Sequence, residues 1–264
     1  MEHTFDYGPR GRVIVVRDPA ALAQRAVDLA LTAVSHAQAA RRWAYVVLSG
    51  GSTPRQMGEL LAREPYRDLT LWHNLHVFWG DERWVPLQSD ESNAGVMKRI
   101  FLDHVPIPAA QVHPMPTACM TPAEAAQRYE ELICELVPAE GGVPRFDVIF
   151  LGMGEDGHTA SLFPHTPAIH ERERLVVAHH VPQLGTTRLT MTPPVFNAGR
   201  QIIILVAGTS KAERLQEVLD GPERPDDLPV QIVRPVLGEL IWLVDRAAAS
   251  RLSIASQLSS AVHD

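Results

Sequence analysis

Residues 146–164, FDVIFLGMGEDGHTASLFP, combine side chains that could carry out chemistry. Gly152, Gly154 and Gly157 follow an apolar run with the G-x-G-x-x-G spacing of dinucleotide-binding loops. Such a loop normally follows the first strand of its unit, leads into a full helix and is followed by an acidic residue at the end of the next strand. Here the segment lies past the middle of the chain, and prolines allow only a short helix after it. These features argue against a nicotinamide-binding loop.

The histidine that follows the last glycine, His158, suits a general base, because an imidazole has an ordinary pKa of about 6.5. Asp156 lies two residues earlier and could fix the imidazole tautomer or stabilise the imidazolium. Gly157 between them permits a sharp turn, and backbone N–H groups nearby could polarise a carbonyl oxygen. The alternative is that His158 only caps the short helix.

A second turn, SGGSTP, is typical of an anion-binding site. Its glycines would let backbone N–H groups approach a phosphate, its hydroxyls add donors, and the helix that follows adds partial positive charge. The residues concerned are Gly50, Gly51, Ser52 and Thr53. The turn is not a P-loop, since no G-K-[ST] ends it. The alternative is a strand-to-helix turn capped by a serine or threonine.

Lys211 and Arg188 could complete a phosphate clamp with this turn. Lys211, in GTSKAERL, falls in the first turn of a predicted helix, where a cation is unfavourable unless an anion lies nearby. Arg188 begins a short predicted strand and would add a bidentate fork. Taken singly, each is equally explained as solvated surface.

A third cluster, WGDERWVP, places Asp81, Glu82 and Arg83 at the end of a predicted strand. A solvated group of charges is the ordinary interpretation. The tryptophans on either side, however, indicate partial burial.

Strands alternate with helices along the chain, and this alternation predicts an α/β fold with an open, mostly parallel sheet covered by helices on both faces. Strands are predicted at residues 12–16, 44–48, 75–84, 146–152, 200–206 and 238–245, and helices at 18–40, from Pro54 onward, at 121–136 and at 210–219. Four polar turns follow four of these strands. Ligands bind at the carboxyl ends of strands in such sheets, so we expect the four turns to form one site. We expect a single domain, residues 1–264.

The composition is that of an ordinary globular protein: 264 residues, 45% hydrophobic, with a formal charge of −7. The acidic balance argues against nucleic acid as a partner but not against an anionic substrate. Cys119 and Cys134 form no C-x-x-C motif, which favours a reducing compartment. No signal peptide or membrane span is evident, so we expect a cytoplasmic protein with no membrane partner. The other histidines lack metal-ligand spacing, and we predict no metal site.

Five stretches together resemble the 6-phosphogluconolactonase family: LSGGSTP, FWGDERWVP, FDVIFLGMGEDGHTASLFP, RLTMTPPVFNAG and VAGTSKAE, in this order. The resemblance runs over residues 46–245. It implies a Rossmann-like fold shared with glucosamine-6-phosphate deaminases. It also implies hydrolysis of 6-phospho-D-glucono-1,5-lactone to 6-phosphogluconate in the oxidative pentose phosphate pathway, without cofactor or metal.

The resemblance assigns roles by position. His158 matches the family's proposed general base, assisted by Asp156. The sugar-phosphate cradle is matched by Gly50, Gly51, Ser52, Thr53, Arg188 and Lys211. Asp81 and Arg83 match a polar edge near the sugar ring, and Arg83 or backbone donors would stabilise the oxyanion.

Two other functions are compatible with this fold. A deaminase or isomerase would carry a catalytic glutamate where this chain has Phe163, and a tyrosine where it has Arg83. A sugar-phosphate-sensing module of a regulator would need a DNA-binding segment, and about ten residues before the first strand are too few for one. A monomer and a small homo-oligomer both remain open.

Overall fold

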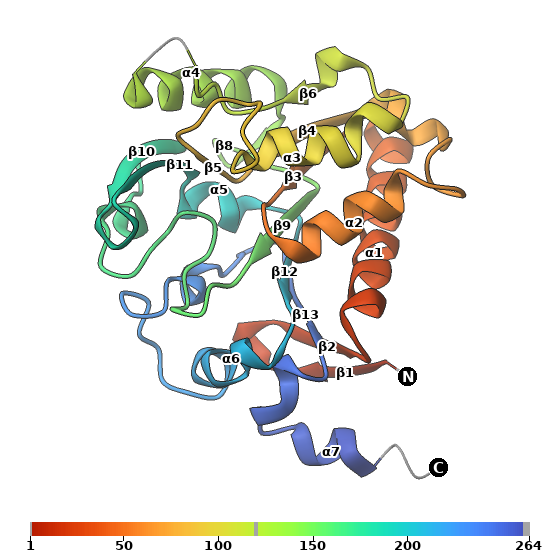
Figure 1. The fold of residues 1–264 in the computed structure, drawn as a ribbon, viewed down its shortest axis with the longest axis vertical. Helices are drawn as coiled ribbons and strands as arrows, with labels where there is room; N and C mark the ends of the chain where they lie inside the picture. Colours follow the sequence, from red (N-terminus) through yellow and green to blue (C-terminus); the bar gives the residue numbers. More distant parts are fainter. Residues whose placement is uncertain (1, 119–120, 261–264) are drawn as a thin grey trace.

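The computed structural model describes residues 2–118 and 121–260. In this part of the chain, an eight-stranded sheet has the order β1-β2-β13-β12-β9-β3-β4-β6 (Figure 1). Its strands are β1 (His3–Asp6), β2 (Arg12–Val16), β3 (Ala44–Leu48), β4 (Leu75–Trp79), β6 (Val112–His113), β9 (Val148–Gly152), β12 (Gln201–Val206) and β13 (Glu239–Asp245). Only the edge strand β1 pairs antiparallel with its neighbour; the other pairs in this sheet are parallel. The predicted α/β class is confirmed.

Helices cover both faces of this sheet. The helices are α1 (Pro19–Arg41), α2 (Ser52–Leu61), α3 (Asn93–Ile100), α4 (Pro122–Leu136), α5 (Pro193–Ala198), α6 (Ala212–Leu219) and α7 (Ala255–Ser260). Alternate residues of one strand point to opposite faces. Accordingly, Val46 and Leu48 of β3 pack with α1, α2 and α3, whereas Val47 packs with α4, α5 and α6. The two resulting cores are nearly continuous apolar layers, as expected for a sheet buried on both sides.

Helix ends follow local sequence signals. Asp18 caps α1, its Oδ1 accepting from the backbone N–H of Ala21 at 2.8 Å, and Pro19 occupies the first helical position. The predicted capping box of Thr121 and Glu124 starts α4. Short 3₁₀ helices lie at Gly8–Arg10, Thr70–Asn74, Leu102–His104, Ala109–Gln111, Pro167–His170, Pro182–Leu184, Thr209–Lys211, Pro229–Ile232 and Ala248–Arg251. Across the described residues, no helix is both long and apolar enough to cross a membrane.

A second, smaller sheet lies beside the first, and the sequence did not predict it. Its order is β10-β11-β5, with β5 at Asp81–Arg83, β10 at Val176–Val181 and β11 at Thr186–Met191. Both pairs are antiparallel. A separate hairpin joins β7 (Ala139–Glu140) to β8 (Val143–Pro144). We refer to the three-stranded sheet as the small sheet.

The prediction of one strand over residues 75–84 is wrong, because the chain changes sheets at Gly80. The Gly80 N–H donates to the Leu48 carbonyl in β3 at 3.0 Å, and the Gly80 carbonyl accepts from Met191 N–H in β11 at 2.8 Å. Gly80 therefore joins the main sheet to the small sheet. The charged residues that follow, Asp81–Arg83, leave the main sheet and form strand β5 of the small sheet.

Candidate active site

The four polar turns meet at one edge of the main sheet. They follow β12, β9, β3 and β4, which are consecutive neighbours in the strand order. Together they enclose a cavity of about 270 Å³. Eight of the predicted site residues line it: Gly50, Gly51, Ser52, Thr53, Asp81, Arg83, His158 and Lys211. A neighbouring hollow of about 440 Å³ shares Gly50, Gly51, Ser52 and Arg83 with this cavity.

The glycine turn leaves the start of α2 without a side-chain cap. Gly51 is the N-cap residue, with φ +114°, and no side chain bonds to the first turn. The alternative of a serine or threonine cap is therefore wrong. The uncapped N–H groups of the ten-residue helix remain available to an anion in the cavity. Gly50 is also required by packing, because a Cβ there would lie 1.9 Å from Asn93 Oδ1.

Glu82, in the predicted charge cluster, is buried, and its carboxylate accepts from backbone N–H groups at the start of α3. Its carboxylate accepts from the backbone N–H groups of Arg83, Asn93 and Ala94 at 2.8–2.9 Å, and from Ser92 Oγ at 3.0 Å. Burial raises the pKa of Glu82, while these backbone bonds oppose the rise. The interpretation as a solvated charge cluster is wrong, since Glu82 is 1% exposed and Asp81 7% exposed.

Asn93 belongs to the site and was missed by sequence reasoning. It is buried, lines the cavity, and donates through Nδ2 to the Asp81 carbonyl at 3.0 Å. Its Oδ1 abuts Gly50. Asp81 in turn accepts from Ser161 Oγ at 2.8 Å through Oδ2. The only signal in the sequence was Ser92 as a helix N-cap, which places Asn93 at the start of α3.

His158 is oriented by Asp156. His158 Nδ1 lies 2.6 Å from Asp156 Oδ1, and the same oxygen accepts from the His158 backbone N–H at 3.1 Å. Burial raises the pKa of Asp156, but the hydrogen bonds and charge of His158 more than offset it, and the pKa lies below its ordinary value. An ionised Asp156 accepts, so Nδ1 carries the hydrogen and Nε2 keeps a lone pair.

The loop around His158 contains no helix, contrary to the prediction. The turn at Gly157 has φ +84°, and the next helical turn is Pro167–His170. His158 therefore does not cap a helix. Its ring stacks on Phe163 with centroids 4.2 Å apart, and a Cβ on Gly154 would lie 2.1 Å from its Nδ1. Ala160, a non-glycine residue at φ +48°, lines the cavity in a strained conformation that costs about 1–2 kcal/mol.

Arg83 and Arg188 lie side by side on neighbouring strands of the small sheet. They are register partners in β5 and β11. The Nε atoms of both are buried without a hydrogen-bond partner, and Arg83 Nη1 donates to the Glu91 carbonyl at 2.6 Å. Burial, and then the charge of Arg83, lowers the pKa of Arg188. Like charges placed opposite one another are unfavourable, so an anion beside them would stabilise the pair. Arg188, unlike Arg83, does not line the cavity.

Lys211 lies at the other side of the cavity, at the end of the Thr209–Lys211 turn. Its Nζ is 4.0 Å from Glu155 Oε1. The side chain is 23% exposed, so it is partly desolvated and still able to reach a ligand. The cavity therefore combines a cation, uncapped helix N–H groups and an oriented imidazole. These are the components needed to bind a phosphorylated substrate and activate a water molecule.

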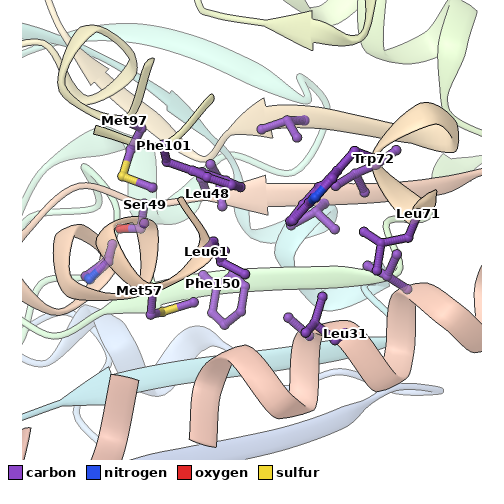
Figure 2. Close-up of a pocket in the computed structure, with 17 residues that line it drawn as sticks. Leu31, Leu48, Ser49, Met57, Leu61, Leu71, Trp72, Met97, Phe101 and Phe150 are labelled. Atoms are coloured by element: carbon purple, nitrogen blue, oxygen red, sulfur yellow. The ribbon is translucent and has the colours of Figure 1, made fainter. Parts of the chain in front are cut away.

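A different, apolar cavity lies beneath α2. Figure 2 shows its apolar lining, which includes Met57, Leu61, Trp72, Phe101 and Phe150. Its volume is about 40 Å³, and it shares only Ser49 and Pro54 with the polar cavity. Its lining contains no titratable side chain, so it serves the packing of α2 against α1.

The exposed histidines His165 and His170 and the cysteine Cys134 do not line the cavity. His165 and His170 are exposed and bond to Asp227 and Asp226, respectively. Among the residues described, no three His, Cys, Asp or Glu side chains gather to hold a metal ion. Cys134 is a free, exposed thiol, and Cys119 lies outside the described residues.

Comparisons with known proteins agree on one family. Residues 17–242 match the family model described as glucosamine-6-phosphate isomerases/6-phosphogluconolactonase. The chain is 42% identical to a 6-phosphogluconolactonase of Synechocystis sp. over 88% of this chain and 94% of that protein. The 6-phosphogluconolactonase structure from Trypanosoma brucei superposes with a TM-score of 0.81 at 27% identity, covering 91% of this chain and 98% of that one. A monomeric glucosamine-6-phosphate deaminase shares the fold, with a TM-score of 0.74 at 21% identity over 90% and 99% of the two chains.

Proposed function

Because the chain belongs to the family of glucosamine-6-phosphate isomerases and 6-phosphogluconolactonases, we infer that it hydrolyses 6-phospho-D-glucono-1,5-lactone to 6-phospho-D-gluconate. This reaction belongs to the oxidative pentose phosphate pathway. The observation that carries the assignment of the site is the imidazole of His158, which shares one cavity with the glycine turn and Lys211.

In the proposed mechanism, His158 Nε2 takes a proton from a water molecule whose oxygen attacks the lactone carbonyl carbon. Negative charge develops on the carbonyl oxygen and is stabilised by Arg83 or by backbone N–H groups beside His158. The bond from the carbonyl carbon to the ring oxygen then breaks, and the imidazolium returns its proton to that oxygen. Asp156 stabilises the imidazolium in between. A positioned base contributes about 10²–10⁴-fold to such a reaction.

The substrate phosphate is held by cations and backbone donors. The uncapped start of α2 and Lys211 supply them at the cavity, and Arg188 adds positive charge from β11, beside Arg83. Asp81 accepts from a sugar hydroxyl at the same cavity. Ester hydrolysis involves no redox change, and every group in this mechanism belongs to the chain itself. We propose that the enzyme works without cofactor or metal, as a single domain in the cytoplasm.

The deaminase alternative is disfavoured by Phe163. Its ring stacks on His158, at the position where the deaminases carry a catalytic glutamate, and a phenyl ring transfers no proton. The direct test is formation of 6-phosphogluconate from freshly generated lactone, followed by a coupled dehydrogenase with the spontaneous hydrolysis subtracted. We expect enzyme-dependent product that persists in EDTA. Release of ammonia from glucosamine 6-phosphate without lactone hydrolysis would overturn the assignment.

A further inference from the structure

The His158 loop, residues 153–163, runs from the main sheet to the small sheet. At the main sheet, Thr159 Oγ1 donates to the Gly152 carbonyl of β9, and Gly154 N–H donates to the His158 carbonyl, both at 2.8 Å. Ala160 follows with φ +48°. A non-glycine residue keeps such a conformation only where its surroundings enforce it. The residue that could enforce it is the next one along the chain.

Ser161 is bonded to all three strands of the small sheet. Its Oγ donates to Asp81 Oδ2 of β5 at 2.8 Å, and its backbone N–H lies 3.4 Å from Thr190 Oγ1 of β11. Its carbonyl accepts from His179 Nε2 of β10 at 2.7 Å. Ser161 is 1% exposed, and neither Ser161 nor His179 lines the cavity. Of the three bonded partners, only Asp81 lines the cavity.

His179 acts in this arrangement as a donor. A carbonyl oxygen only accepts, so the bond to Ser161 requires the hydrogen on Nε2. Nδ1 is buried without a hydrogen-bond partner, and Arg188 is the register partner of His179. Burial lowers the pKa of His179, and the charge of Arg188 lowers it further, although the Ser161 bond opposes them. His179 is therefore a neutral imidazole with one defined tautomer.

We propose that Ser161 and His179 are positioning residues for the reaction inferred above, fastening the His158 loop to the small sheet so that His158 Nε2 faces the bound lactone. The proposal rests on that reaction only for its kinetic readout. It explains why the small sheet, which carries Arg83 and Arg188, also holds the loop of the base. Alignment of the base then depends on the same sheet that carries these two arginines.

The adjacent histidines provide a matched pair of variants. His180 follows His179 in β10, points to the opposite face and is exposed. We expect His179→Leu to lower kcat about tenfold with KM changed less than twofold, and His180→Leu to leave both unchanged. His179→Gln, whose amide can donate to the Ser161 carbonyl, should recover part of the loss. Ser161→Ala should act in the same direction, and the Ser161→Ala/His179→Leu double variant should lose no more than the more severe single variant.

Two kinetic results would overturn the proposal. Equal kcat values for His179→Leu and His180→Leu would mean that the anchor does not position the base. A rise in KM alone would place His179 on the substrate instead. Ser161→Ala keeps the comparison decisive if His179→Leu fails to fold, because it removes one hydroxyl from the same anchor.

A measurement that needs no turnover separates this proposal from the proposed function. The imidazole ¹H–¹⁵N signals of His158 report its bond to Asp156 directly. We expect them to shift or broaden in His179→Leu and to match wild type in His180→Leu. Unchanged signals in both variants would contradict the anchor even in an active enzyme. Inactivity of the wild-type protein toward the lactone would contradict the reaction, whatever the spectra show.

Discussion

At the scale of single residues, the site depends on the bond from His158 to Asp156. Its length of 2.6 Å and the lowered pKa of Asp156 both indicate an ionised carboxylate facing the ring N–H. A depressed carboxyl pKa contributes stability above the ordinary value of 3.8 and loses it as the pH falls through the folded-state pKa. Asp156 is therefore ionised near neutral pH, where its carboxylate accepts from the ring N–H.

Removing that charge should slow the reaction without weakening substrate binding. We expect Asp156→Asn to reduce kcat about 10–100-fold with KM within twofold, because the amide no longer stabilises the imidazolium. Asp226→Asn is a matched control, since Asp226 pairs with the exposed His170 at 3.0 Å. Steady-state kinetics of the two variants decides the matter. Equal activities would mean that Asp156 has no part in catalysis.

Lys211 should contribute to binding, because a point charge near the phosphate acts on ground state and transition state alike. We expect Lys211→Met to raise KM about 10–100-fold with kcat changed only a few-fold. Lys98, the other lysine in the sequence, lies on α3, pairs with Asp103 and does not line the cavity. Lys98→Met should match wild type. A Lys211→Met variant that lost kcat at unchanged KM would place this lysine at the reacting carbon.

Most of the polar residues that line the cavity could be predicted one by one, because their types suit the chemistry and they follow predicted strands. Asn93 could not, since a single asparagine at the start of a helix is usually structural. Its role becomes visible only when the fold brings it against Gly50 and Asp81. Arg188 was predicted to belong to the cradle, and the small sheet places it beside Arg83 and outside the lining of the cavity.

At the scale of elements, the glycine turn before α2 is the part least tolerant of change. A Cβ at Gly50 would collide with Asn93, whose amide is tied to Asp81. We expect Gly50→Ala to lower kcat/KM at least tenfold and stability by about 1–3 kcal/mol, as overpacking does. Gly141→Ala, in the β7–β8 hairpin with open space and φ +62°, should cost about 1 kcal/mol and keep full activity. Kinetics and urea unfolding of both variants test this; full activity in Gly50→Ala would contradict the packing.

Sequence patterns located most elements and missed the small sheet. Residues 75–84 read as one strand because apolar and charged residues run on without a proline. The change of sheet at Gly80 depends on its bond to Met191, which lies more than 100 residues further along the chain. The helix predicted after Gly157 does not form, for a similar reason. Bonds from Ser161 to three distant strands outweigh the local preference of the segment.

At the scale of the whole molecule, a buried histidine pair should make the fold sensitive to acid. His76 Nδ1 and His113 Nε2 lie 2.9 Å apart on β4 and β6. Burial, and then the charge of His76, lowers the pKa of His113 from 6.5 to about 4. A histidine with a depressed folded-state pKa contributes stability above pH 6.5, and that stability is lost as the pH falls toward 4.

We therefore expect the free energy of unfolding to fall by about 1–3 kcal/mol more in the wild type than in His113→Gln between pH 7 and pH 4.5. Because both proteins contain the same carboxylates, the contribution of these groups to the pH dependence cancels in the difference between the two. Urea denaturation at a series of pH values measures it. Parallel pH dependences in the two proteins would show that His113 does not resist protonation in the fold.

The order of the strands explains how turns from distant parts of the chain form a single site. Four turns separated by up to 160 residues meet because β12, β9, β3 and β4 are consecutive neighbours, as the rule for parallel sheets predicted. The rule requires only the positions of the strands, and the alternation of strands and helices in the sequence indicates those positions. Only the structure reveals the second sheet, the uncapped start of α2 and the anchoring of the His158 loop.

The central claim is that His158 is the base for attack on the lactone. It is tested most directly by kcat/KM of His158→Ala for 6-phospho-D-glucono-1,5-lactone, corrected for spontaneous hydrolysis. The structure predicts a loss of about 10²–10⁴-fold, carried by kcat, with substrate binding retained. Turnover within a few-fold of wild type would contradict the claim.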